Sequence, residues 1–189
     1  MKDGYIKVAA ATPKVKVADT VYNGQLIRDL MKECTDNGAK VVVFPELCIT
    51  GYTCQDLFWQ DKLIRSAEAE LIEIADYSRE LDGIFFIGLP YEINGMLYNV
   101  AAVVSRGEVL ALVPKTFLPN YNEFYEARHF ASGGNLSAYV TLSNGQQVPV
   151  DTDFIFSCKQ MPKLKIAVEL CEDLWTPNPP SIRHAMSGA

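Results

Sequence analysis

Two stretches of the chain place apolar residues at the spacing of an amphipathic helix. The first covers residues 21–37 and ends at Asn37-Gly38, a pair that often closes a helix in the left-handed conformation. The second covers residues 61–80, where the charged side chains lie mostly off the apolar stripe. The pattern therefore predicts two helices that each pack one face against a core.

Runs rich in Val, Ile and Phe and bounded by Gly or Pro predict strands. Residues 40–44 and 84–88 are apolar in succession, as in strands covered on both faces, and Leu89-Pro90 is expected to end the second. Residues 98–104 and 109–113 flank Arg106-Gly107-Glu108, a turn typical of a β-hairpin. Further strands are predicted over residues 6–11 and 164–170, with short weak strands between residues 147 and 156.

The order of these elements is strand, helix, strand, helix and then mostly strands, which predicts a mixed sheet with helices on its faces. The fold class is therefore α/β. Residues 116–135 carry aromatic and polar side chains without a clear period, and such a long segment in a compact domain is typical of a functional loop. We expect one domain over residues 1–189.

The composition argues against several classes of protein. Hydrophobic residues make up 49% of the chain and charged residues 21%, which is ordinary for a globular domain. The net charge of −6, without a Lys/Arg block, argues against a nucleic-acid or anionic-membrane partner and favours a small-molecule substrate. No run approaches the apolar length of a membrane span, and the polar start Met1-Lys-Asp-Gly lacks the apolar core of a secretory signal. A cytoplasmic location is expected.

The five cysteines are odd in number and contain no CxxC pair, which indicates neither a disulfide framework nor a zinc site. We expect reduced thiols and no metal site. Cys171 differs from the others because it follows the predicted strand 164–170, and the prolines from Pro177 onward prevent any regular continuation. A thiol at the end of a strand in an open α/β sheet faces a substrate crevice.

Glu46, Lys115 and Cys171 each follow the end of a predicted buried strand. Since neighbouring parallel strands end at one edge of a sheet, these side chains are expected to converge there. A cysteine thiolate is a strong nucleophile, Glu46 can take its proton, and the Lys115 ammonium, with the backbone N–H after Cys171, can stabilise the oxyanion of a reacting carbonyl. The alternative stays open: an inert buried thiol, with Glu46 and Lys115 as capping or ion-pair residues.

A cysteine and a histidine are a common alternative pair in hydrolases, and the chain contains His129 and His184. Neither histidine stands at the end of a predicted strand, and the sequence contains no GxCxG turn. The residues therefore favour the Glu–Lys–Cys set.

Three segments resemble the signature segments of the carbon–nitrogen hydrolase (nitrilase) superfamily, in the same order and at similar spacing. They are Phe-Pro-Glu46-Leu, Pro-Lys115-Thr-Phe-Leu-Pro and Glu-Leu-Cys171-Glu-Asp-Leu-Trp175. Residues 9–19, 50–58 and 118–126 are more specifically similar to the glutaminase domains of the glutamine-dependent NAD synthetase family. The resemblance covers essentially the whole chain and implies a nitrilase-like α-β-β-α sandwich.

The resemblance implies a role for each matching residue. Cys171 would be the nucleophile, Glu46 the general base and then acid, and Lys115 the oxyanion partner. Glu123 matches an additional glutamate that orients the lysine. Positions that line the glutamine pocket match Tyr52, Tyr121, Phe124 and Glu172. The implied reaction converts glutamine and water to glutamate and ammonia through a γ-glutamyl thioester.

The resemblance also implies partners. A superfamily domain continues past its cysteine with strands that complete the sandwich, so we expect the chain to be a fragment of a longer homo-oligomeric protein. The synthetase domain of the same polypeptide, absent here, would bind ATP and magnesium and amidate deamido-NAD, whereas the glutaminase domain would need no cofactor. A stand-alone amidase or nitrilase of the same superfamily and a non-catalytic interaction module are the remaining alternatives.

Overall fold

A seven-stranded mixed sheet forms the centre of the computed structural model, which describes residues 4–189 and leaves Met1 to Asp3 of the polar start outside it. The strands lie in the order β1 (Lys7–Ala10), β2 (Ala39–Val43), β3 (Ile84–Ile93), β4 (Met96–Ser105), β5 (Glu108–Pro114), β7 (Gln147–Val150) and β6 (Ala138–Thr141). Strands β8 (Phe156–Cys158) and β9 (Met161–Ile166) form a separate two-stranded sheet.

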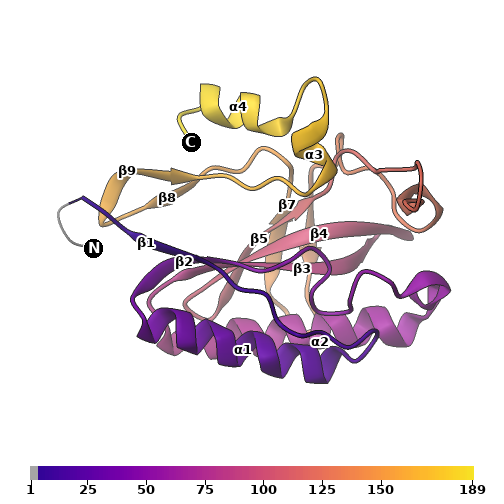
Figure 1. The fold of residues 1–189 in the computed structure, drawn as a ribbon, viewed down its shortest axis with the longest axis horizontal. Helices are drawn as coiled ribbons and strands as arrows, with labels where there is room; N and C mark the ends of the chain where they lie inside the picture. The colour runs from indigo at the N-terminus through magenta and orange to yellow at the C-terminus, as the bar shows by residue number, and fades with distance from the viewer. Residues whose placement is uncertain (1–3) are drawn as a thin grey trace.

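The helices lie on both sides of the central sheet. Helices α1 (Thr20–Asp36) and α2 (Asp61–Tyr77) cover one face, and the β8–β9 sheet lies over the other face with α3 (Glu172–Trp175) and α4 (Pro180–Met186) beyond it (Figure 1). Short 3-10 turns cover Gln55–Trp59, Ser78–Glu80 and Glu126–Arg128. Among residues 4–189, no helix combines the length and the hydropathy that crossing a membrane requires.

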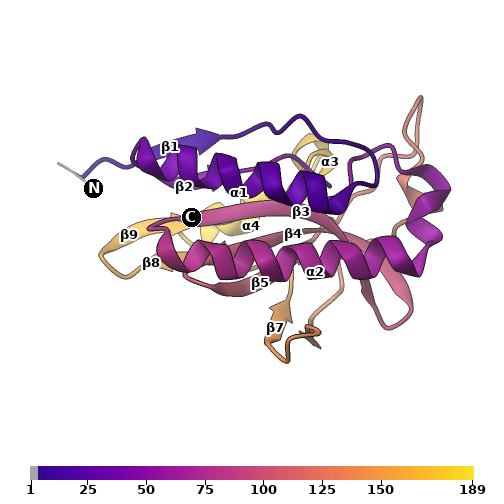
Figure 2. The ribbon, with the colours of Figure 1, turned by 90° about the horizontal axis from the view of Figure 1, so that it is seen from below.

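The predicted amphipathic helices are confirmed. Helices α1 and α2 contact each other and run side by side beneath the sheet (Figure 2). Their stripes supply Ile27, Met31, Leu71 and Ile74, which are fully buried against the sheet. Burial of each such side chain contributes about 1.5–3 kcal/mol, so this layer holds the helices in place.

The central sheet is apolar on both faces, as the sequence predicts for its covered strands. Along β3, Phe85 and Ile87 join the core between the sheet and helices α1 and α2. Phe86 points to the opposite face of the sheet, where it packs with Phe156 of β8. This alternation is the period of a strand. The second layer therefore rests on an apolar surface that the first layer does not use.

Strand directions determine which loops meet. β1, β2 and β3 are parallel, while β4 is antiparallel to both β3 and β5. Consequently β5 runs in the same direction as β2 and β3, and these three strands end at the same edge of the sheet. The predicted hairpin between β4 and β5 is confirmed.

The prediction that Leu89-Pro90 ends a strand is wrong, because β3 continues to Ile93 and turns back into β4 at Asn94-Gly95. Both turn residues have positive φ, as tight hairpin turns require. β2 pairs with β3 only as far as Phe86. Pro90 therefore lies beyond this pairing, where the missing N–H of a proline breaks no hydrogen bond to β2.

The strand predicted over residues 164–170 begins and ends earlier than expected. β9 ends at Ile166 and pairs with β8 alone, so Cys171 does not follow a strand of the central sheet. Val168 and Leu170 continue the apolar alternation of Ile166 because all three pack against the outer face of that sheet. These residues thus alternate like a strand because every second side chain packs on the sheet, although residues 167–170 pair with no strand in the described part of the chain. Strand β6 was also not predicted.

Candidate active site

Glu46 lies in the turn that follows β2, and close packing against β3 fixes this turn. The N–H of Phe44 donates to Phe86 O at 2.9 Å, and the N–H of Ile49 donates to Gly88 O at 3.1 Å. A Cβ atom on Gly88 would lie 2.7 Å from Pro45 O and 2.8 Å from the carbonyl carbon of Glu46. Only a glycine at position 88 allows the Glu46 turn to pass so close to β3.

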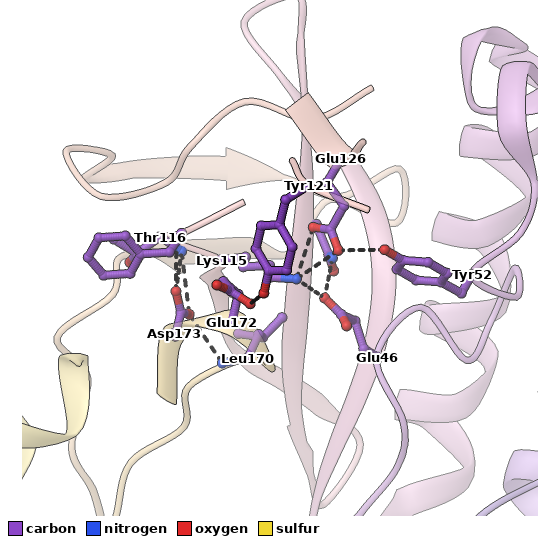
Figure 3. A network of polar contacts seen from close by, with 11 residues as sticks. Glu46, Tyr52, Lys115, Thr116, Tyr121, Glu126, Leu170, Glu172 and Asp173 are labelled. Atoms are coloured by element: carbon purple, nitrogen blue, oxygen red, sulfur yellow. Dashed lines mark hydrogen bonds and ion pairs between the residues drawn. The ribbon is translucent and has the colours of Figure 1, made fainter. Parts of the chain in front are cut away.

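Lys115 follows β5 at the same edge of the sheet and is fully buried. Its N–H donates to Asn99 O and its carbonyl accepts from the Gly133 N–H, both at 2.8 Å. The ammonium Nζ lies 2.7 Å from Glu46 Oε1 and 2.9 Å from each carboxylate oxygen of Glu126 (Figure 3). The predicted convergence of Glu46 and Lys115 at one edge is therefore present in the structure.

The charges around Lys115 keep it a cation. Burial acts to lower the pKa of Lys115, but the adjacent carboxylates of Glu46 and Glu126 raise it above its ordinary value. Burial also raises the pKa of Glu126, while Lys115 acts in the opposite direction. The Glu126 carboxylate also accepts a 2.9 Å hydrogen bond from Tyr52 Oη, so hydrogen-bond donors largely compensate its negative charge. The Glu46 carboxylate differs because it is partly exposed to solvent.

Asn99 is a further residue of this site that the sequence did not reveal. It lies in β4 without exposed surface, and its Nδ2 donates to Glu46 Oε1 at 2.6 Å. The signal in the sequence was a single amide within an otherwise apolar strand. Together, Asn99 and Lys115 fix Oε1 of Glu46.

Cys171 lies at the tight turn where α3 begins, and its backbone has φ 43° and ψ −99°. This left-handed φ is strained for a residue other than glycine, and such strain often occurs at functional sites. Burial and then the Glu46 carboxylate raise the pKa of the Cys171 thiol, whereas Lys115 acts to lower it. The thiol is thus within the electrostatic influence of both residues although it does not follow a strand of their sheet.

The four residues predicted for the substrate pocket lie together beside these side chains. Tyr52 contacts Glu126, and Tyr121 Oη donates to Glu172 Oε2 at 2.9 Å (Figure 3). The ring of Phe124 packs edge-on against both tyrosines, at centroid distances of 6.5 Å and 5.9 Å. Their binding to glutamine stays a prediction.

The glutamate that contacts Lys115 is Glu126, not the predicted Glu123. Residues 116–135 have no sequence period that could distinguish the two positions. The 3-10 turn at Glu126–Arg128 directs Glu126 inward to 4% exposure, whereas Glu123 is exposed. Both glutamates line a cavity of 390 Å³ together with Tyr52, but of the two only Glu126 forms a hydrogen bond with Lys115 in the described part of the chain.

The histidines have other surroundings. His184 Nε2 lies 2.9 Å from Thr152 O, and His129 packs against the rings of Phe58 and Trp59. Burial lowers the pKa of His129. Within residues 4–189, no hydrogen bond joins either imidazole to Cys171, which disfavours the Cys–His alternative.

Residues 7–189 match the family profile described as "Carbon-nitrogen hydrolase". The chain belongs to the carbon–nitrogen hydrolase family. This membership agrees with the resemblance found in the three sequence segments, and with a mixed α/β sheet that places Glu46 and Lys115 at one edge.

Curated members of this carbon–nitrogen hydrolase family with similar sequences are much longer than the chain. The glutamine-dependent NAD(+) synthetase of Mycobacterium tuberculosis is 37% identical over 186 residues, which cover 98% of this chain and 27% of that protein. The enzyme of the same name from Aquifex aeolicus is 33% identical over 174 residues, covering 92% and 27%. The chain thus spans about a quarter of the length of these relatives.

Solved structures agree with the fold. The crystal structure of a glutamine-dependent NAD(+) synthetase from Cytophaga hutchinsonii matches with a TM-score of 0.79 and 31% identity, covering 88% of this chain and 28% of that chain. An amidase from Nesterenkonia sp. matches with a TM-score of 0.60 and 21% identity, covering 82% and 59%, and shares the fold alone.

Proposed function

We propose that this chain is the glutaminase part of a glutamine-dependent NAD synthetase, in which Cys171 attacks the side-chain amide of glutamine. The observation that supports this most directly is the buried ammonium of Lys115, held between Glu46 and Glu126 where both Glu46 and Lys115 act on the Cys171 thiol. Two relatives that are 37% and 33% identical to the chain over the aligned residues carry the name of this enzyme.

The first half of the reaction forms a thioester. The raised pKa of Cys171 leaves the thiol protonated at neutral pH, so a base must take its proton during attack, and Glu46 is the carboxylate that acts on it. The sulfur adds to the amide carbon, and the carbonyl oxygen becomes an oxyanion. Lys115 Nζ and the N–H of Glu172 would donate to this oxygen.

The second half restores the enzyme. Protonated Glu46 returns its proton to the leaving nitrogen, so that ammonia departs and a γ-glutamyl thioester remains on Cys171. Glu46 then takes a proton from a water molecule, whose oxygen adds to the thioester carbon. The carbon–sulfur bond breaks, glutamate is released, and Glu46 returns the proton to the Cys171 sulfur. Each proton that Glu46 accepts is donated again, which is the behaviour of a general base that also serves as general acid.

In the full-length polypeptide, the released ammonia would amidate deamido-NAD in a synthetase domain. That reaction requires ATP and magnesium, and we assign both to residues outside this chain. Within residues 4–189, no group of three or more His, Cys, Asp or Glu side chains is arranged to hold a metal ion. The thioester steps of glutamine hydrolysis use side chains and one backbone N–H of this chain.

The experiment combines turnover with site-resolved labelling of the full-length protein. Glutamine is expected to yield glutamate and ammonia, and short aliphatic amides or nitriles to react far more slowly. A glutamine-analogue electrophile should modify Cys171 first, with protection by glutamine. Burial raises the pKa of Cys48 to about 12, so this thiol should react last. Faster turnover of an aliphatic amide or nitrile would favour the amidase alternative, and first labelling at Cys48 or Cys54 would remove Cys171 as nucleophile.

A further inference from the structure

Asp173 lies shortly after Cys171 and is a buried carboxylate, with 1% of its surface exposed. Its Oδ1 accepts the N–H of Thr116 at 3.0 Å and the N–H of Phe117 at 2.8 Å, and its Oδ2 accepts the N–H of Leu170 at 3.2 Å (Figure 3). The side chain thus uses both of its oxygens on backbone amides and reaches neither Glu46 nor Lys115 by hydrogen bonds in the described residues.

These amides belong to two different catalytic segments. Thr116 and Phe117 directly follow Lys115, and Leu170 directly precedes Cys171. The N–H of Asp173 also donates to Leu170 O at 2.9 Å, so Leu170 and Asp173 close the turn around Cys171 from both sides. One carboxylate therefore shapes the nucleophile turn and joins it to the segment that carries the oxyanion lysine.

Strand pairing within the central sheet does not provide this connection. Glu46 and Lys115 follow strands of one sheet, but the strand before Cys171 ends at Ile166 and pairs with β8 alone. Cys171 also has a strained φ of 43°, which the surroundings must enforce. A contact that spans both segments is needed to keep the sulfur at a constant position relative to Lys115.

The chemistry of Asp173 suits this task. Burial raises the pKa of Asp173, and the N–H groups of Phe117, Leu170 and Thr116 act to lower it. An ionised carboxylate only accepts hydrogen bonds, and charge-assisted bonds to N–H groups are roughly twice as strong as neutral ones. An asparagine of the same shape would carry one acceptor fewer and would point an NH₂ group at a backbone N–H.

We propose that Asp173 is a positioning residue that docks the Cys171 turn onto the segment after Lys115, and so holds the nucleophile beside the oxyanion lysine. The role for glutamine hydrolysis rests on the proposed function. The docking of the Cys171 turn does not rest on the proposed function, because it concerns only the position of the sulfur relative to Glu46 and Lys115.

The test compares Asp173→Asn with the parent in the full-length protein. We expect kcat for glutamine to fall by about a hundredfold while KM changes by less than about threefold, because misplaced reacting atoms affect the transition state more than the bound substrate. The pH midpoint for alkylation of Cys171 by iodoacetamide should move down, since an undocked thiol loses the burial that raises its pKa. This second measurement needs no substrate.

Controls separate positioning from folding. Asp153→Asn removes an exposed carboxylate that pairs with Arg183 at 2.9 Å, and it should change neither measurement. Asp173→Ser, which keeps one acceptor oxygen, replaces the first variant if Asp173→Asn does not fold. A variant that melts earlier but keeps the parental kcat, or one that keeps the parental alkylation midpoint, overturns the proposal. If the parent does not hydrolyse glutamine, the proposed function fails, and the alkylation midpoint alone decides the role of Asp173.

Discussion

The ammonium of Lys115 contacts two carboxylates that have different surroundings. Glu126 is buried, binds Lys115 through both oxygens and receives a hydrogen bond from Tyr52. Glu46 binds Lys115 through one oxygen and is partly exposed. Glu126 therefore holds the cation in place, whereas the partly exposed Glu46 is the carboxylate that acts most strongly on the Cys171 thiol and can exchange protons with it.

This division of roles predicts that Glu126 and Glu123 differ sharply on substitution. Glu126→Gln should reduce glutamine turnover by about tenfold to a hundredfold, because a hydrogen bond to a charged group contributes about 1.5–3 kcal/mol. Glu123→Gln should leave turnover within about twofold, since this carboxylate is exposed to solvent. Steady-state kinetics of the two variants show which glutamate orients Lys115. A larger loss of turnover for Glu123→Gln than for Glu126→Gln would assign this role to Glu123, as the sequence resemblance implied.

The Cys171 thiol provides a second prediction, in which reactivity and turnover change in opposite directions. The negative charge of Glu46 raises the pKa of Cys171, so Glu46→Gln should lower that pKa and increase the thiolate fraction at pH 8. Alkylation by iodoacetamide should then be faster at pH 8, and its midpoint should lie at lower pH, while glutamine turnover is lost with the base. Rates from pH 6 to 10 measure this, with Glu123→Gln as control. A midpoint at higher pH would contradict the effect of Glu46 on the thiol.

At the scale of elements, Gly88 connects the central sheet to the active site. The turn that carries Glu46 crosses β3 so closely that a methyl group on residue 88 would displace Pro45 and Glu46. Gly88→Ala is expected to cost about 1–3 kcal/mol of unfolding free energy, as overpacking does, and also to reduce turnover. Gly83→Ala is the matched control, because the closest atom to its new methyl would be the ring edge of Phe85, at 3.1 Å. Denaturant unfolding and kinetics of both variants test this, and equal effects would contradict it.

The elements also show what a sequence pattern can and cannot predict. Helices α1 and α2 and the β4–β5 hairpin follow from local periodicity and turn residues, so they could be predicted. The extension of β3 through Pro90 could not, because it depends on β2 ending early beside it. The apolar alternation up to Leu170 indicated a strand, although it reflects packing against the outer face of the sheet.

At the scale of the whole molecule, Glu46 and Lys115 could be predicted to meet, because both follow strands that run in one direction. The approach of Cys171 follows from neither strand order nor periodicity, since Cys171 belongs to a second layer held by the backbone contacts of Asp173. The choice between Glu123 and Glu126 depended on a single 3-10 turn inside an aperiodic loop. Contacts between segments distant in sequence, rather than local patterns, determine these parts of the site.

The proposed function divides one synthesis between two active sites of a long polypeptide, which predicts a selective defect for Cys171→Ala. Cys171 is exposed, and alanine adopts its strained φ no less readily, so the fold should be retained. Formation of NAD with glutamine as nitrogen source should fall by about a thousandfold or more, as expected for loss of a nucleophile. Formation with ammonium salts should stay within about twofold of the parent, because free ammonia bypasses the thioester.

Both rates are measured on the full-length protein with ATP, magnesium and deamido-NAD, and Cys158→Ala is the control. Equal loss of the two activities would mean that Cys171 supports the structure rather than the chemistry.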